Sequence, residues 1–154
     1  MSGRWAHSMD LEVCLRDTDA MGHVNNAVYL SYLELARQGY WRLVAPEQRY
    51  DEVPFVLAHA DLAFRSPSHA GDSLRVFSRT AWMGRTSIGM EAVIRDVATE
   101  RVVVESTCVL VIYDYETRAA VPIPPSLRAR LEAVEGGPLP ERPSKALGRR
   151  GAIG

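Results

Sequence analysis

A long run of helical periodicity between Ala27 and Ala45 restricts the folds that this chain can adopt. Apolar residues recur there every three or four positions and so share one face of a helix: Tyr29, Leu33, Ala36, Tyr40 and Val44. Three more apolar residues widen that surface: Leu30, Trp41 and Leu43. Pro46 ends the helix, and Asn25 or Asn26 offers an N-cap. A helix that is apolar over so wide an arc is expected to be mostly buried.

Five segments around this helix are predicted to be β-strands. Met9–Arg16 precedes the helix. Four segments follow it, in which apolar and polar residues alternate or nearly every residue is apolar: residues 56–65, 73–83, 87–95 and 102–113. Short turn segments separate the later strands, with a spacing that suits antiparallel hairpins. The economical arrangement is α+β, with an antiparallel sheet wrapped around a central helix. Pro124 and Pro125 then open a short amphipathic helix.

The 154 residues suit one domain, which we assign to residues 1–134. Residues 135–154 hold five Gly and three Pro, no aromatic residue, and four basic against two acidic side chains. A segment with so little to bury does not offset its ordering entropy alone. We therefore predict a flexible Gly/Pro-rich C-terminal tail.

Composition excludes several classes of function. The net charge of −1 argues against a domain that binds nucleic acid through its overall field. No run of eighteen apolar residues is present, and the N-terminus does not resemble a secretory signal. Two cysteines cannot build a disulfide framework, and with scattered histidines they offer no metal-ligand spacing. We expect a cytoplasmic protein without metal, cofactor, nucleic acid or membrane partner.

The segment from Asp17 to Asn26, between the first strand and the helix, is unusually rich in polar chemistry. It holds two carboxylates, one histidine and two carboxamides. The following helix presents unpaired N–H groups and a positive dipole end there, which can bind an oxyanion. A nearby carboxylate can activate water or attack a carbonyl. The alternative interpretation is a capped, solvated turn in which His23 only bonds a backbone carbonyl.

A resemblance to a known family favours the functional interpretation. Asp17-Thr18-Asp19, Gly22-His23-Val24-Asn25-Asn26, Tyr29-Leu30 and Glu34-x-Ala36-Arg37 resemble the signature of the 4-hydroxybenzoyl-CoA thioesterase family. Weaker agreement continues at Arg65-Ser66-Pro67, Gly71-Asp72-Ser73-Leu74 and Gly84-Arg85-Thr86-Ser87. The resemblance implies the hotdog fold, a five-stranded antiparallel sheet around one long helix. It also implies a homodimer or homotetramer with active sites at the dimer interface.

The same resemblance implies roles for individual residues. Asp19 matches the catalytic carboxylate, and the Asn26 backbone N–H matches the group that polarises the thioester carbonyl. Arg85 and Ser87 match a hairpin near the pantetheine or phosphates of coenzyme A, for which Arg65 and Arg101 are further basic candidates. Two residues complete the predicted substrate-binding set, His23 and Tyr29, the latter in the acyl groove. The resemblance thus implies an acyl-CoA thioesterase.

Two other functions stay open at this point. Acyl-ACP thioesterases also carry a Gly-His-Val-Asn-Asn form, but Met21 stands where their Asn is expected, which favours a single catalytic aspartate. A non-catalytic acyl-CoA-binding protein is the alternative from another class. Glu34 and Arg37 have helical i, i+3 spacing, and we expect them to form a structural ion pair.

Overall fold

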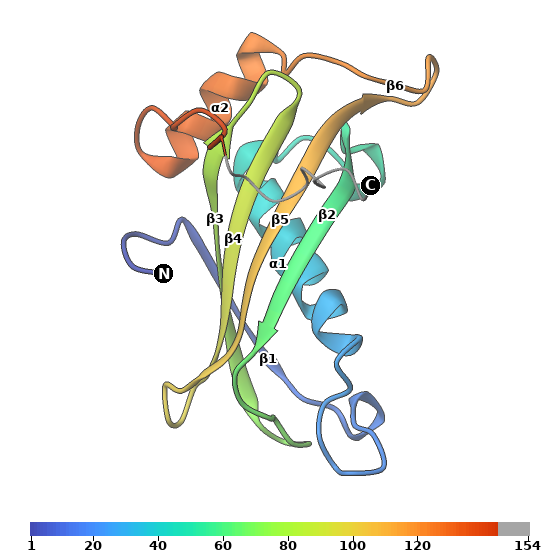
Figure 1. Ribbon diagram of the computed structural model, residues 1–154, viewed down its shortest axis with the longest axis vertical. Coiled ribbons are helices and arrows are strands. Elements are labelled where there is room, and N and C mark those ends of the chain that lie inside the picture. Colours follow the sequence, from blue (N-terminus) through green and yellow to red (C-terminus); the bar gives the residue numbers. More distant parts are fainter. Residues whose placement is uncertain (145–154) are drawn as a thin grey trace, which may run out of the picture.

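A curled antiparallel sheet packs around a long helix in the computed structural model, which describes residues 1–144 (Figure 1). The five main strands are β1 (His7–Glu12), β2 (Phe55–Phe64), β3 (Ser73–Met83), β4 (Ser87–Asp96) and β5 (Val102–Asp114). They pair in the order β1-β3-β4-β5-β2, and a short sixth strand, β6 (Ala119–Ala120), pairs with β5. The long helix is α1 (Val28–Val44), and α2 (Pro125–Glu135) follows the sheet. The predicted α+β hotdog arrangement is confirmed, with β6 in addition.

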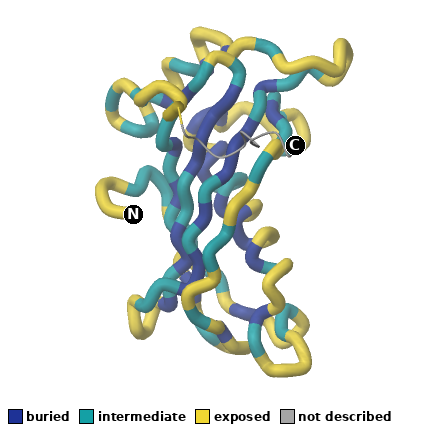
Figure 2. Tube along the Cα trace, viewed as in Figure 1, coloured by how far each residue is buried: buried dark blue, intermediate teal, exposed yellow. Residues whose placement is uncertain are grey.

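The inner face of α1 builds the core. Seven of its residues are buried, including all five predicted from the periodicity: Tyr29, Tyr32, Leu33, Ala36, Tyr40, Trp41 and Val44. Figure 2 shows this buried stripe facing the buried middle of the sheet. The helix is less covered than expected, because Leu30, Leu35 and Leu43 are 45–49% exposed. No helix among residues 1–144 is long and apolar enough to cross a membrane.

Both ends of the segment before α1 differ from the sequence-based expectation. The first strand stops at Glu12, and Leu15–Asp17 forms a 3₁₀ turn in which Leu15 is 79% exposed. The helix has Ala27 at its N-cap, so the prediction of Asn25 or Asn26 there is wrong. Instead, the Asn25 side-chain oxygen accepts the Ala27 N–H at 2.9 Å and closes a turn ahead of the helix.

The expected ion pair between Glu34 and Arg37 is not formed within the described residues. Glu34 is exposed, whereas an Arg37 guanidinium nitrogen lies 3.9 Å from the buried Cys108 sulfur. The helix turns Arg37 towards β5 and Glu34 towards solvent, so i, i+3 spacing alone does not bring the two side chains together.

The segment assigned to a flexible tail begins inside the fold. Glu135 is the last residue of α2, Gly136 has the positive φ of a helix end, and the Met83 N–H donates to the Pro140 carbonyl at 2.9 Å. Residues 135–144 are therefore held by the end of β3. The rest of the predicted tail, residues 145–154, lies outside the described residues.

Glu135 joins α2 to the sheet and the core helix. Its carboxylate accepts the Tyr40 O–H and the Thr80 N–H, each at 2.7 Å. Thr80 borders a bulge in β3. Burial raises the pKa of the Tyr40 hydroxyl well above its usual value. The Tyr40 hydroxyl thus stays a hydrogen-bond donor at ordinary pH.

Removing the Glu135 carboxylate should destabilise the protein. Glu135→Ala leaves the buried Thr80 N–H without an acceptor, and we expect it to lower the free energy of unfolding by about 2 kcal/mol. Glu132→Ala, on the same helix, should change it by less than about 0.5 kcal/mol. Urea denaturation of both variants measures this, and equal effects would contradict the structural role of Glu135.

His7 should make stability pH-dependent. Its ring lies against α1, where a Cβ on Gly39 would come within 2.5 Å of Nε2, and its Nδ1 is buried without a partner among residues 1–144. Burial lowers the pKa of His7 from its usual 6.5. The unfolded chain therefore takes up this proton first as pH falls, so stability is lost below about pH 6.5. Urea denaturation at pH 5.5 and 7.5 should show a smaller loss for His7→Gln than for the wild type, and an equal loss would refute this role.

Candidate active site

Backbone hydrogen bonds close the loop before α1 into a narrow hairpin. The Asp19 N–H donates to the His23 carbonyl at 2.8 Å, and the Gly22 N–H donates to the Asp19 carbonyl at 3.0 Å. Gly22 has a φ of +78°, which favours glycine at the tip. The Val24 N–H donates to the Ser68 carbonyl at 2.8 Å and fixes the hairpin to the β2–β3 connection.

One oxygen of the Asp19 carboxylate is held and the other is open. Oδ1 accepts the Met21 N–H at 2.9 Å and, more weakly, the His23 N–H at 3.4 Å. Oδ2 accepts no hydrogen bond from residues 1–144. The side chain is therefore oriented by its own loop, while one oxygen stays available to a water molecule or a carbonyl carbon.

Asp19 and Asn26 line the same pocket, of about 250 Å³, at the start of α1. His23, Val24 and Tyr29 also line it. The end of β2 contributes Phe64, and the segment after β2 contributes Arg65, Ser66 and Pro67. Within the described chain no acceptor takes the Asn26 backbone N–H. Asp19, with its open carboxylate oxygen, and Asn26, with an unpaired backbone N–H just ahead of α1, thus line one pocket. This combination suits attack on a carbonyl whose oxygen becomes negative.

Asp17 has a structural position. Its Oδ2 accepts the Cys14 N–H at 3.2 Å and the Tyr32 O–H at 2.7 Å. Burial raises the pKa of Tyr32 above its usual value, and the Asp17 hydrogen bond adds to that shift. Asp17 therefore ties the loop to the inner face of α1, two residues before Asp19.

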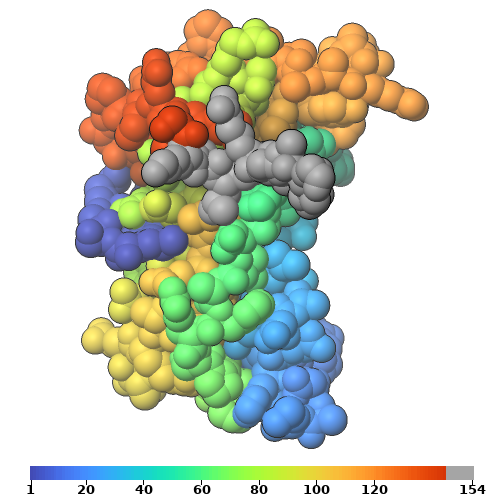
Figure 3. All heavy atoms as spheres, in the orientation of Figure 1, coloured from blue at the N-terminus to red at the C-terminus, as the bar shows by residue number. Residues whose placement is uncertain are grey.

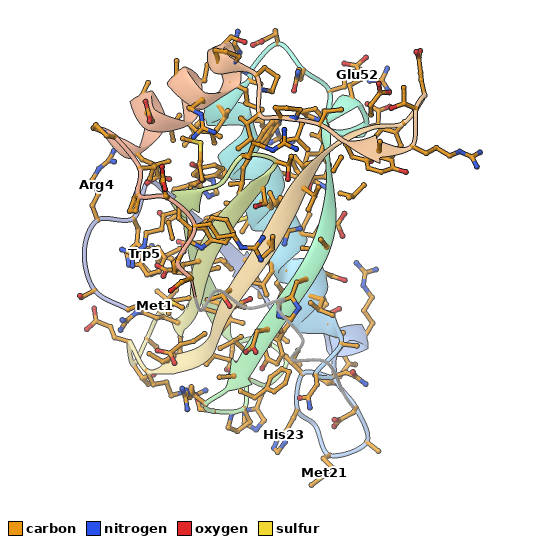
Figure 4. The ribbon with its side chains drawn as sticks, turned by 45° about the horizontal axis from the view of Figure 1, so that its top comes forward. Met1, Arg4, Trp5, Met21, His23 and Glu52 are labelled. Carbon is orange, nitrogen blue, oxygen red and sulfur yellow. The ribbon has the colours of Figure 1, made fainter. Side chains whose placement is uncertain are left out.

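His23 and Tyr29 both line the pocket and have different neighbours. The His23 ring stands edge-on to His69, with centroids 5.1 Å apart, at the end of the molecule where Figure 4 labels His23 and Met21. Tyr29 is 3% exposed and packs against Phe64 with centroids 5.9 Å apart. Burial raises the pKa of Tyr29, and its hydroxyl has no hydrogen-bond partner among the described residues.

Of the basic and hairpin residues predicted to bind coenzyme A, only Arg65 lines the Asp19 pocket. Arg85 and Ser87 belong to the β3–β4 hairpin, at the end of the sheet opposite the Asp19 loop (Figure 1). Arg65 does line the Asp19 pocket, where its guanidinium pairs with Glu105 at 2.9 Å. Arg101 lies 3.8 Å from Asp96 and 3.9 Å from Asp72, so two carboxylates already neutralise it.

Sequence reasoning missed Phe64 and Pro67 as pocket residues. Their signal was the weaker Arg65-Ser66-Pro67 match, but only the packing of the β2 end against Tyr29 brings this segment to the pocket. No group of three or more His, Cys, Asp or Glu side chains in residues 1–144 is arranged to hold a metal ion.

Comparisons with known proteins agree with the fold. The sequence profile of the thioesterase-like superfamily matches residues 13–131. A thioesterase from Thermus thermophilus, solved in complex with coenzyme A and Zn, is 35% identical with a TM-score of 0.80, over 88% of this chain and 98% of that one. A probable thioesterase from Escherichia coli is 26% identical with a TM-score of 0.71, over 82% and 97% of the two chains.

A 1,4-dihydroxy-2-naphthoyl-CoA thioesterase from Synechocystis shares the fold, with 19% identity and a TM-score of 0.71 over 80% of this chain and 93% of that one. Among curated protein sequences, none matches.

Proposed function

This chain belongs to the thioesterase-like superfamily and is a thioester hydrolase, and from that premise we propose that it hydrolyses acyl-coenzyme A at the Asp19 pocket. The observation that carries the proposal is the shared pocket of the open Asp19 oxygen and the unpaired Asn26 N–H. Coenzyme A bound to the Thermus thermophilus thioesterase supports this choice of carrier.

Asp19 supplies the carboxylate of the reaction. It either takes a proton from the attacking water or attacks the thioester carbon itself, giving a mixed anhydride that water then cleaves. The Met21 N–H holds the non-reacting oxygen in both routes. Thiolate is a good leaving group, so neither route needs a strong general acid.

The Asn26 N–H stabilises the oxyanion. Negative charge that develops on the thioester oxygen lies at the N-terminal end of α1, where the helix dipole adds to the hydrogen bond. One well-placed donor of this kind lowers the barrier by about 3 kcal/mol. His23 and Tyr29 form part of the wall of the site. They contact the substrate away from the reacting bond.

The active form is a homodimer, in which the β2 edges of two chains pair. β2 is one of the two edge strands of the sheet, the other being β1, and its Leu57 and Phe64 are 47% and 48% exposed. Phe64 also lines the Asp19 pocket, so a second chain on this edge would wall the pocket. Light scattering at low micromolar concentration should give twice the chain mass, or four times for a homotetramer. A monomer mass would contradict the assembly.

The experiment that tests the activity is thiol release from a panel of acyl-CoA substrates with short, long and aromatic acyl groups. We expect turnover on at least one, and the ranking of kcat/KM names the acyl class. Stoichiometric binding of the same thioesters without thiol release would contradict hydrolysis and indicate a non-catalytic binding protein. Turnover on acyl-ACP but not on matched acyl-CoA would show that the acyl carrier is ACP and not coenzyme A.

A further inference from the structure

Two histidines from distant parts of the sequence meet beside the Asp19 pocket. His23 lies in the hairpin before α1 and lines the pocket, and His69 lies in the connection between β2 and β3. Their backbones form an antiparallel bridge, next to which the Val24 N–H donates to the Ser68 carbonyl at 2.8 Å. Figure 3 shows the two segments packed together at one end of the molecule. The bridge therefore holds the two imidazole side chains next to each other.

The spacing of the two imidazole rings suits one shared metal ion. Their centroids are 5.1 Å apart, with the ring planes at 84°. A zinc–nitrogen bond is about 2.1 Å long, so two imidazoles on one tetrahedral ion have their centroids about 5 Å apart. His69 is exposed and His23 is half-buried, so an ion can reach the pair from solvent. Two nitrogen ligands are thus available at the separation that one ion requires.

Asp72 orients His69 and prepares its ring for metal binding. The Asp72 carboxylate accepts the His69 backbone N–H at 2.8 Å and lies 3.8 Å from the ring nitrogen Nδ1. A carboxylate in this position favours a proton on Nδ1 and leaves the lone pair of Nε2 for a metal ion. Metal-binding histidines in proteins commonly have a carboxylate behind them in this way.

The ligand chemistry selects the class of ion. Imidazole nitrogen binds Zn²⁺, Cu²⁺ and Ni²⁺ well, whereas Mg²⁺ and Ca²⁺ prefer oxygen ligands. Residues 1–144 place no third His, Cys, Asp or Glu side chain to complete a metal site, so water fills the remaining positions. Two protein ligands and water indicate reversible binding rather than a permanent structural metal.

We propose that His23 and His69 together bind one divalent transition-metal ion beside the Asp19 pocket, and that this ion inhibits hydrolysis there. The ion adds bulk and positive charge at the pocket wall that His23 forms. It also ties the Asp19 hairpin to the β2–β3 connection, since its two ligands come one from each segment. The inhibition rests on the proposed function, whereas the metal binding does not.

Metal binding is measured first, without substrate. Titration calorimetry with Zn²⁺ should give one site per chain, and we expect His69→Ala to weaken the affinity at least about tenfold. Asp72→Asn keeps an acceptor for the His69 N–H but removes the charge, and it should weaken Zn²⁺ binding about tenfold. Electron paramagnetic resonance of bound Cu²⁺ should show two nitrogen ligands in the wild type and one in His69→Ala. Equal affinity and equal Cu²⁺ spectra in the wild type and His69→Ala would overturn the site.

Cys14→Ser is the matched control, because Cys14 is an exposed cysteine and thiolates also bind Zn²⁺. We expect this variant to bind Zn²⁺ as the wild type does. Loss of binding in Cys14→Ser, with binding retained in His69→Ala, would assign the ion to the thiol and overturn the proposal. His69 is exposed, so its replacement by Ala should leave the fold intact.

Inhibition is measured on an acyl-CoA that the wild type hydrolyses, by following the absorbance of the thioester, because the released thiol itself binds Zn²⁺. Saturating Zn²⁺ should lower kcat/KM of the wild type at least about tenfold, and a chelator should restore it. His69→Ala should keep its metal-free activity and lose the sensitivity to Zn²⁺. Zn²⁺ binding that depends on His69, in a chain that hydrolyses no thioester, would refute the proposed function and keep the metal site. Hydrolysis that Zn²⁺ lowers equally in both proteins, or in neither, would refute the inhibition and keep the function.

Discussion

Asp19→Asn should lower kcat for acyl-CoA hydrolysis at least 100-fold and leave KM within about threefold. The substitution keeps the shape of the side chain and its bond to the Met21 N–H, but removes the charge that activates water or attacks the carbonyl. A 100-fold loss corresponds to about 2.7 kcal/mol of activation free energy. Steady-state thiol release at saturating substrate measures the effect.

Asp17→Asn is the matched control, because it makes the same charge change two residues away. The oxygen of the introduced carboxamide can still accept the Cys14 N–H and the Tyr32 O–H, so activity should stay within about fivefold of the wild type. Equal losses in the two variants would mean that loop structure, and not the Asp19 charge, limits the rate.

Gly89→Ala should destabilise the protein by about 3 kcal/mol. Gly89 lies opposite Trp82 on the paired strands β3 and β4, and an added Cβ would lie 2.0 Å from the indole Cε2. The ring would have to move, and Arg142 with it, because the guanidinium lies over that ring. Overpacking of this kind typically costs about 1–3 kcal/mol, and the short contact puts Gly89 at the upper end.

A double-mutant cycle isolates this clash. In the Trp82→Ala background, Gly89→Ala should cost less than about 1 kcal/mol, since the indole is gone. Gly137→Ala is the control, because no atom lies within 4 Å of a Cβ built there. Urea denaturation gives the four free energies of unfolding, and an undiminished cost without the indole would refute the packing explanation.

The helix and most strands were predictable because their apolar periods are long. The five apolar positions from Tyr29 to Val44 lie on one face of the helix over about four turns, and all five are buried. Short-range signals failed where two local choices compete. Asn25 was expected to cap α1 but bonds the Ala27 N–H in a turn of its own, and Leu15 fits a strand pattern but turns outward once Asp17 caps the 3₁₀ turn.

The candidate site was predictable only in its contiguous part. Asp19, His23, Asn26 and Tyr29 are close in sequence, and the structure brings them to one pocket. Phe64 reaches that pocket by tertiary packing alone, which no local pattern encodes. The role of Glu135 was equally hidden, since its partners Tyr40 and Thr80 are 95 and 55 residues away in sequence.

The most direct test of the central claim is to quantify both products from one acyl-CoA by mass spectrometry, for the wild type and for Asp19→Asn. We expect the wild type to form free acid and free coenzyme A in equal amounts, over many turnovers. Product formation should be at least 100-fold slower for the variant. Equal product formation by the two proteins, or no free acid from the wild type on any substrate of the panel, would contradict hydrolysis by the Asp19 carboxylate.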